Sequence, residues 1–333
     1  RDLLDWPSPF NGDSGTGSGS VHELDGEPEM RLAIQLREVP YDRIIGALPE
    51  GVLPDEWGIA LGGTLDLTVR IGGPLADREA WDLGWKGDWT RLHLRQSHMD
   101  TAFSNLLNAF PYFIEQPDGS VLHREMGPSD PHYLPLQMIH PDLVSAVVVS
   151  EDASFWAHGG FDEAELRQAI LENLREDGGG RGGSTITQQV AKNLFLSGER
   201  TMTRKIQEAL LAWRIEGTVP KQRIMEIYLN RAELGPGIWG VRDAAYHYFG
   251  TSCRQLNTRE CVFLATMLPA PVRYHDYYHP KGQITSRWDE HIAQVLYRMH
   301  RQGYLTEREY DTALHAPLQF VPCDQYGGNE GAR

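Results

Sequence analysis

Two adjacent carboxylates, Glu151 and Asp152, follow an apolar stretch that is rich in valine. The apolar period of this stretch predicts a helix over residues 141–150. A carboxylate at the end of an apolar helix is partly removed from water, which raises its pKa towards the working range of a general base. Glu151 is therefore a candidate proton acceptor. The alternative is an ordinary helix end with solvated acidic side chains, and this segment alone does not distinguish the two.

A second segment with polar chemistry reads GGSTITQQVAKN over residues 182–193. The glycine-rich stretch 178–183 predicts a mobile loop, after which Ser184 or Thr185 is expected to cap a helix over 185–196. Four polar residues fall on one face of that helix, at spacings of i, i+4, i+7 and i+8: Thr185, Gln189, Lys192 and Asn193. A hydroxyl, amides and a cation on one face suit a phosphate or a sugar. An ordinary capped amphipathic helix is the alternative.

Charged side chains mark a third segment, for which the apolar period predicts a helix over 202–217. Arg204 and Glu208 stand four residues apart, so an intrahelical ion pair of small energetic value explains both. The alternative is a cationic clamp of Arg204 and Lys205 for a departing pyrophosphate, with Glu208 as a second carboxylate.

Two further segments consist mainly of packing residues. One predicts a helix over 221–230 and a glycine-rich turn at 235–240, with Glu226 and Asn230 as polar exceptions. The other, 260–271, predicts a core helix that ends at a proline, and we assign no chemistry to it.

The elements that must position these residues fall into two groups. Before about residue 130, apolar and polar residues alternate at 30–37, 65–71 and 91–95, and the turn residues 117–119 separate two further short strands. From about Pro135 the period becomes 3.6, which predicts additional helices over 163–176, 240–248, 258–268 and 286–302. The fold class expected is α+β, with a β-rich N-terminal module before a mainly α domain.

Domain boundaries follow from this change of period. Residues 1–20 include the run NGDSGTGSGS and are expected to form a flexible linker. The β-rich module is expected over residues 21–130 and the helical domain over residues 131–325. Trp81, Trp85 and Trp89 are expected in the core of the module, with sugar stacking as the alternative.

The acidic composition limits the classes of ligand. A formal net charge of −15 at pH 7 argues against nucleic acid as a partner. Basic residues nevertheless gather over 181–231, which predicts a local anionic ligand. The cysteines, Cys253, Cys261 and Cys323, lack zinc-site spacing and are expected to be buried hydrophobes, with a single disulfide left open.

The sequence shows no recognisable membrane-targeting signal. No apolar run reaches the roughly 18 residues that a membrane-spanning helix requires. The sequence has no signal-peptide pattern and starts at Arg1, so we expect it to be a segment of a longer protein. Any membrane anchor is expected outside this segment.

In this order and spacing, the five segments resemble the five motifs of glycosyltransferase family 51, the peptidoglycan glycosyltransferases. The stretches EDASFWAHGGFD (151–162) and GGSTITQQVAKNLFL (182–196) carry most of the resemblance, which covers roughly residues 136–320. Members occur as the N-terminal domain of class A penicillin-binding proteins and as monofunctional enzymes, and no SxxK, SxN or KTG transpeptidase motif follows here. Thr251 and Cys261 depart from the family pattern of lysine and alanine. The β-rich module, loosely similar to AsmA-like envelope proteins, is also atypical.

The resemblance implies a lysozyme-like domain that polymerises lipid II by processive, inverting transfer. Glu151 would deprotonate the 4-hydroxyl of the acceptor sugar, whose oxygen attacks the anomeric carbon of the growing chain while undecaprenyl pyrophosphate leaves from the opposite face. Glu208 would be the second catalytic carboxylate. The resemblance assigns substrate binding to Asp152, Phe155, His158, Thr185, Gln189, Lys192, Asn193, Arg204, Lys205 and Glu226.

The resemblance also implies partners and a location. It implies no definite cofactor. A divalent cation, Mg²⁺ or Mn²⁺, is left open at the pyrophosphate, with Glu208 as its candidate ligand. The expected partners are lipid II, the growing glycan chain and the bacterial membrane, at the periplasmic face of the inner membrane. Other cell-envelope proteins are candidates for docking on the β-rich module.

Two other functions are left open by the motifs. A glycan-cleaving enzyme of lysozyme-like fold would share the catalytic glutamate, but its leaving group is a sugar and does not need the cations Lys192, Arg204 and Lys205. A catalytically silent envelope scaffold is the other alternative, which the unusual N-terminal half favours and the intact Glu151 and Glu208 oppose.

Overall fold

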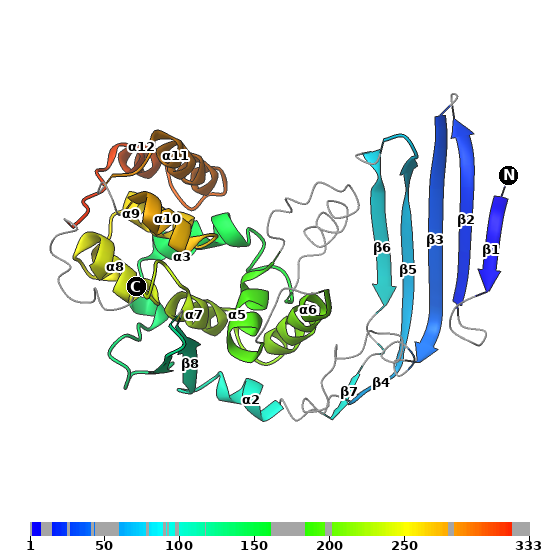
Figure 1. Cartoon of the computed structure of the whole chain (residues 1–333), viewed down its shortest axis with the longest axis horizontal. Helices are drawn as coiled ribbons and strands as arrows, with labels where there is room; N and C mark the ends of the chain where they lie inside the picture. The colour runs from blue at the N-terminus through cyan, green and yellow to red at the C-terminus, as the bar shows by residue number, and fades with distance from the viewer. Residues whose placement is uncertain are drawn as a thin grey trace. The chain divides into compact units, whose positions relative to one another are not determined.

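The structure is a computed structural model of the chain (Figure 1). It describes residues 2–7, 15–24, 27–40, 43, 60–77, 80–88, 91, 93–96, 100–116, 118–160, 184–196, 202–278 and 283–321. The chain forms two compact units. The first contains Arg1–Ala102, Asp162–Gly183 and Arg200–Gln207, and the second contains Phe103–Phe161, Ser184–Glu199 and Glu208–Arg333.

The first unit contains an antiparallel sheet of five strands in the order β1-β2-β3-β5-β6 (Figure 1). Its strands are β1 (Asp2–Pro7), β2 (Gly15–Leu24), β3 (Glu27–Pro40), β5 (Thr64–Pro74) and β6 (Asp82–Asp88). A smaller sheet pairs β4 (Ala60–Gly62) with β7 (His93–Gln96). The register sets Leu32 opposite Ile71 and Ile34 opposite Val69. The alternation predicted for these strands is thus confirmed, with their apolar side chains on one face.

The N-terminal segment differs from the flexible linker that was predicted over residues 1–20. Asp2–Pro7 forms β1, and residues 15–20 begin β2, which pairs with β3 along its whole length. The pairing explains the error, because main-chain hydrogen bonds to a long neighbouring strand offset the weak strand preference of glycine. Residues 8–14 lie outside the described residues.

Strand β6 was not predicted from the sequence. Trp85 stands opposite Val69 in this strand and is half-buried, and the Trp81 indole N–H donates to the Pro74 carbonyl oxygen at 2.8 Å. Both side chains thus pack or bond within the module, in line with the expectation of a core role. Trp89 lies outside the described residues.

The second unit is mainly helical (Figure 1). Its helices are α3 (Pro141–Glu151), α5 (Ile186–Phe195), α7 (Lys221–Arg231), α8 (Val241–Phe249), α9 (Thr258–Met267), α10 (Pro271–Tyr278), α11 (Ser286–Arg301) and α12 (Glu307–His315), with 3-10 turns η3 (Leu136–Met138) and η4 (Cys253–Gln255). Two helices, α2 (Asp100–Asn105) and α6 (Met202–Glu216), contain residues of both units.

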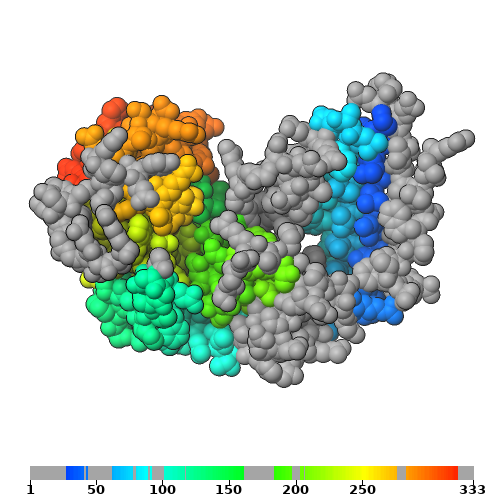
Figure 2. All heavy atoms as spheres, viewed as in Figure 1, coloured from blue at the N-terminus to red at the C-terminus, as the bar shows by residue number. Residues whose placement is uncertain are grey.

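A strand pair, β8 (Pro111–Glu115) with β9 (Val121–Glu125), also belongs to the second unit, although the alternation grouped it with the earlier strands. It lies on the outside of that unit (Figure 2) and exposes Phe113 and Val121.

Helix α3 lies in the core of the second unit and packs against α9 and α11. Its residues Leu143 and 146–149 are buried, as is every residue of α9 from Glu260 to Met267. The Phe263 ring of α9 stacks on Trp288 of α11, with centroids 4.9 Å apart. This burial fixes the helix that ends at Glu151. No helix in the described part of the chain is long and apolar enough to cross a bilayer.

Seven of the predicted helices are confirmed to within one residue at each end: α3, α5, α6, α7, α8, α9 and α11. The prediction over 163–176 lies outside the described residues. Helices α10 and α12 were missed, although a capping box of Thr306 and Glu309 at the start of α12 is visible in the sequence. Cys253 and Cys261 are free and buried, as expected, and Cys323 lies outside the described residues.

Candidate active site

Glu151 is the last residue of α3, and it receives a hydrogen bond from α5. The Gln189 side-chain nitrogen donates to a Glu151 carboxylate oxygen at 2.8 Å. Burial raises the pKa of Glu151, and the negative charge of Asp152 adds to this, whereas the Gln189 hydrogen bond and the Lys192 charge oppose it. The net shift is upward. The raised pKa predicted for a carboxylate at this helix end is confirmed.

A buried tyrosine on α7 extends this contact. The Tyr228 hydroxyl donates to the Gln189 side-chain oxygen at 3.4 Å, so Gln189 bridges Tyr228 and Glu151. Tyr228 does not stand out in the sequence, because a tyrosine among apolar helix residues is usually a packing residue. Only the packing of α5 against α7 brings it to the site.

Asp152 is committed to contacts within the protein. It is buried, and its carboxylate accepts a hydrogen bond from the Ile186 backbone N–H at 3.0 Å. His158 Nε2 lies 3.0 Å from both carboxylate oxygens. Because His158 Nδ1 accepts from the Gly160 backbone N–H at 3.1 Å, Nε2 carries the proton and donates to Asp152. This network ties the turn after Glu151 to the start of α5, where a negative charge is favourable.

Thr185 and Gly160 also connect the turn after Glu151 to the start of α5, and both residues are buried. Thr185 caps α5 by accepting from the Gln188 backbone N–H, and its hydroxyl donates to the Gly160 carbonyl oxygen at 2.8 Å. Gly160 has φ 106°, and a Cβ at this position would come within 2.9 Å of the backbone of α6 at Ala212 and Trp213. The cap predicted for Ser184 or Thr185 is therefore Thr185, and its hydroxyl serves the fold.

Phe155 lies in the core beneath the turn. The Lys221 ammonium lies 4.3 Å from the centroid of its ring and 2.6 Å from a Glu216 carboxylate oxygen. Glu216 in turn accepts from the Thr187 hydroxyl at 2.5 Å. These contacts join α5, α6 and α7, so Phe155 supports the shape of the site from inside the protein.

Glu226 anchors the chain segment that precedes α3. Its carboxylate accepts hydrogen bonds from the Tyr133 hydroxyl and the Leu136 backbone N–H, both at 2.8 Å, and pairs with Arg223. All three partners are protein groups, so in this structure Glu226 positions residues 133–136.

Two neighbours of Glu226 on α7 reinforce this anchor. Arg223 also donates to three backbone carbonyl oxygens, those of Leu106, Asn108 and Met126. Asn230 exchanges hydrogen bonds of 2.7 Å and 2.8 Å with the backbone of Leu134. Helix α7 therefore holds the whole segment that leads into α3.

Comparison with known families decides the assignment. A family model described as Transglycosylase matches residues 118–300, which is more than half of the chain. The chain belongs to the transglycosylase family. The family that the five motifs indicated is thereby confirmed.

Curated relatives of this transglycosylase carry names from cell-wall synthesis. A biosynthetic peptidoglycan transglycosylase of Bordetella pertussis is 48% identical over 159 residues, which cover 46% of this chain and 65% of the relative. A penicillin-binding protein 1A of Aquifex aeolicus is 42% identical over 205 residues, which cover 62% of this chain and 28% of the relative. The chain thus spans less than two thirds of the length of either relative.

A solved structure, penicillin-binding protein 1A from Haemophilus influenzae, also matches. The match has a TM-score of 0.31 and 23% identity, and it covers 64% of this chain and 21% of that chain. No conclusion about the fold of the transglycosylase rests on a likeness of this size.

The remaining candidate residues of the transglycosylase lie on α5 and α6. Lys192 acts electrostatically on Glu151, and Asn193 follows it, half-buried, on the same helix. Glu208 is buried on α6. Arg204 and Lys205 lie one turn earlier on that helix, and they fall in the first compact unit, whereas the other candidates fall in the second.

Glu208 is the candidate ligand that the motifs offer for a divalent cation. The described residues contain no group of three or more His, Cys, Asp or Glu side chains placed to hold a metal ion. A divalent cation usually takes several oxygen ligands, and Glu208 supplies one carboxylate. The divalent cation, Mg²⁺ or Mn²⁺, with Glu208 as its candidate ligand, stays a prediction.

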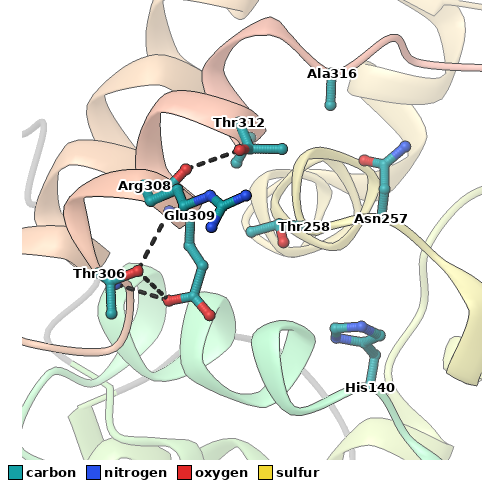
Figure 3. A pocket seen from close by; sticks show the side chains of 9 residues that line it. His140, Asn257, Thr258, Thr306, Arg308, Glu309, Thr312 and Ala316 are labelled. Carbon is teal, nitrogen blue, oxygen red and sulfur yellow. Dashed lines mark hydrogen bonds between the residues drawn. The ribbon is translucent and has the colours of Figure 1, made fainter.

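Two pockets of the transglycosylase stand apart from the Glu151 cluster. One of about 470 Å³ is lined by residues at the starts of α3 and α9 and along the whole of α12, among them His140, Asn257 and Thr306 (Figure 3). It lies about 15 Å from Glu151 along the axis of α3, at the opposite end of that helix. The other, of about 630 Å³, is lined by residues of α10 and α11 such as Arg273 and Arg287. Neither of these two pockets is lined by a candidate residue.

Proposed function

We propose that this chain is a peptidoglycan glycosyltransferase that polymerises lipid II with Glu151 as general base. The observation that carries the proposal is the Glu151 carboxylate, which ends a buried helix, has a raised pKa and is held at 2.8 Å by the Gln189 amide. A base whose pKa lies closer to the operating pH transfers protons most effectively. The family and the names of the relatives support the same function.

In the proposed reaction, Glu151 accepts the proton of the acceptor sugar's 4-hydroxyl. The freed oxygen attacks the anomeric carbon of the growing chain and forms the new glycosidic bond. The bond between that carbon and the pyrophosphate oxygen breaks, and its electron pair leaves with undecaprenyl pyrophosphate. Because attack and departure are on opposite faces, the configuration at the anomeric carbon is inverted.

Positive charge is required on the leaving-group side, because negative charge develops on the pyrophosphate in the transition state. We assign this role to Arg204 and Lys205 of α6, with Lys192 and Asn193 of α5 lining the substrate site and Glu208 as the second carboxylate. Asp152, His158, Thr185, Phe155 and Glu226 act through the geometry of the site, since the contacts described above already commit them to the protein.

The substrate determines where this chain would act. Lipid II is a membrane lipid, so we propose that the chain works at the periplasmic face of the bacterial inner membrane. The five-stranded sheet of the first unit takes no part in the proposed reaction. We propose that it docks other proteins of the cell envelope.

The function is tested by incubating the full-length protein with lipid II and analysing the products. Glycan polymer that is lost in the Glu151→Gln variant would support the proposal. Cleavage of finished glycan without polymerisation would instead support a lysozyme-like hydrolytic enzyme. Inertness towards both substrates, with lipid II bound or not, would support a silent scaffold and contradict the proposal.

A further inference from the structure

The Tyr228 hydroxyl is buried, and the proposed reaction gives it no role. The side chain is 2% exposed, so water cannot satisfy the hydroxyl, and a buried tyrosine O–H normally requires a partner. In the part of the chain that the structure describes, its hydrogen bond to Gln189 Oε1 at 3.4 Å is the one it makes. The Tyr228 hydroxyl therefore contacts the oxygen of the Gln189 amide, whereas Glu151 contacts its nitrogen.

We propose that Tyr228 is a positioning residue that fixes the orientation of the Gln189 amide, so that its nitrogen and not its oxygen faces the Glu151 carboxylate. This inference rests on the proposed function of Glu151 as the base. The two ends of the amide differ chemically, since one carries two donors and the other accepts. Rotation of the amide by half a turn would place its oxygen against the carboxylate, and two acceptors would then face each other.

The ionised Glu151 carboxylate can only accept, so it takes the amide nitrogen, and Tyr228 holds this orientation by donating to the oxygen at the other end. Burial and the nearby charges of Glu151 and Asp152 raise the pKa of Tyr228 well above its ordinary value, so the proton remains in place at the pH of the reaction. A protonated phenol can donate to the Gln189 oxygen, and this contact anchors the end of the amide that faces away from Glu151. Without that donor, nothing described on α7 would hold the oxygen end of the amide.

The orientation matters because it sets the proton affinity of the base. The Gln189 hydrogen bond favours the ionised form of Glu151 and so lowers its pKa, against the larger effect of burial. In the described residues, the charged groups that act on Glu151 are Asp152 from the adjoining turn and Lys192 from α5. Tyr228→Phe alters neither of them, so its effect on Glu151 would pass through Gln189.

The test is the pH dependence of polymerisation by Tyr228→Phe. We expect the acidic limb of the rate profile to move upward by about half to one pH unit, the shift that loss of one neutral hydrogen bond would produce. The rate should fall about three- to tenfold at pH values below the limb and recover at higher pH. General damage to the fold would lower the rate at every pH.

Two control variants test whether the effect of Tyr228 on Glu151 passes through Gln189. In a Gln189→Ala background, Tyr228→Phe should produce no further shift, because the group through which it acts is gone. Tyr248→Phe removes a matched buried hydroxyl, which donates to the Leu234 carbonyl oxygen at 2.7 Å, and it should leave the limb in place. An unmoved limb in Tyr228→Phe, or an equal shift in the Gln189→Ala background, would overturn the proposal.

A second measurement separates this proposal from the proposed function. The difference in unfolding free energy between the chain and Glu151→Gln, followed against pH, reports the pKa of Glu151 without substrate. Tyr228→Phe should raise that pKa even if the wild-type chain makes no polymer, an outcome that would contradict the proposed function alone. If the pKa of Glu151 is unchanged in Tyr228→Phe, the positioning role is contradicted, whether or not the chain makes polymer.

Discussion

The Gln189 side-chain nitrogen lies 2.8 Å from a carboxylate oxygen of Glu151, and this contact joins α5 to the last residue of α3. A negative charge at the C-terminal end of a helix is opposed by the helix dipole, and burial opposes it further. The hydrogen bond from Gln189 offsets part of that cost. Burial thus raises the pKa of Glu151 while the Gln189 hydrogen bond opposes the shift, and a raised pKa suits a base that must both accept and release protons.

The raised pKa predicts the pH dependence of the reaction. The base must be ionised, so the rate should fall as the pH drops through the pKa of Glu151, at a value above the ordinary 4.5 of a glutamate. Initial rates of lipid II polymerisation between pH 4 and pH 9 would show this limb. A rate that stays constant down to about pH 4.5 would mean that the ionisation of Glu151 does not limit the reaction.

The same shift predicts a gain in stability for Glu151→Gln. Because the folded-state pKa lies above the unfolded value, the folded chain binds more protons between those two values, and stability falls as the pH rises through this window. The variant removes this loss, so it should melt at a higher temperature than the wild type at pH 8 and lose that advantage below about pH 4.

Thermal unfolding across pH measures this gain, and Glu309→Gln is its control. Hydrogen bonds from the Thr306 backbone and hydroxyl lower the pKa of Glu309, so its neutralisation should bring no gain at pH 8. Equal melting curves for the wild type and Glu151→Gln at pH 8 would contradict the prediction.

Asp152→Asn should damage both fold and activity. The asparagine oxygen can still accept from the Ile186 N–H, but its amide nitrogen would face the Nε2 proton of His158, and two donors would meet in a buried site. We expect a loss of about 1–3 kcal/mol in the free energy of unfolding and at least about tenfold in rate. Urea unfolding and polymerisation assays check both, and a variant equal to wild type would show that the charge of Asp152 is dispensable.

Arg223→Lys should destabilise the second unit although the charge is kept. One guanidinium pairs with Glu226 and donates to the backbone at Leu106, Asn108 and Met126, which a single ammonium group cannot reproduce. The expected loss is about 2–4 kcal/mol in the free energy of unfolding. Arg254→Lys is the matched control, since this exposed residue makes one backbone hydrogen bond, to Gln137. Similar losses in the two variants would contradict the anchoring role.

Much of the helical unit could be predicted from the sequence because its signals are local. The apolar period placed α3, α5 and α7, and the helix end at Glu151 was enough to predict its raised pKa. Gln189 and Lys192, which the helical spacing placed on one face of α5, both act on Glu151, and their role in substrate binding stays a prediction. Side chains at helical spacing share a face whatever the tertiary structure is.

What could not be predicted depends on contacts between distant segments. Tyr228 meets Gln189 from a position 39 residues away, and Gly160 meets Thr185 across 25 residues. A single sequence does not show which polar groups satisfy each other, so the cap at Thr185 could be predicted but the donation of its hydroxyl to Gly160 could not. The strands within residues 1–20 were missed for a different reason, because their glycine- and serine-rich composition has a weak strand preference that pairing of β1 with β2 and of β2 with β3 offsets.

The most direct test of the account is lipid II polymerisation by Glu151→Gln beside Glu115→Gln, an exposed carboxylate on β8. Removal of a general base typically costs about 10²–10⁴-fold in rate. We predict a loss of this size in Glu151→Gln, with a folded chain that still binds lipid II, and a wild-type rate in Glu115→Gln. Polymer formed by Glu151→Gln at the wild-type rate would contradict the assignment of Glu151 as the base.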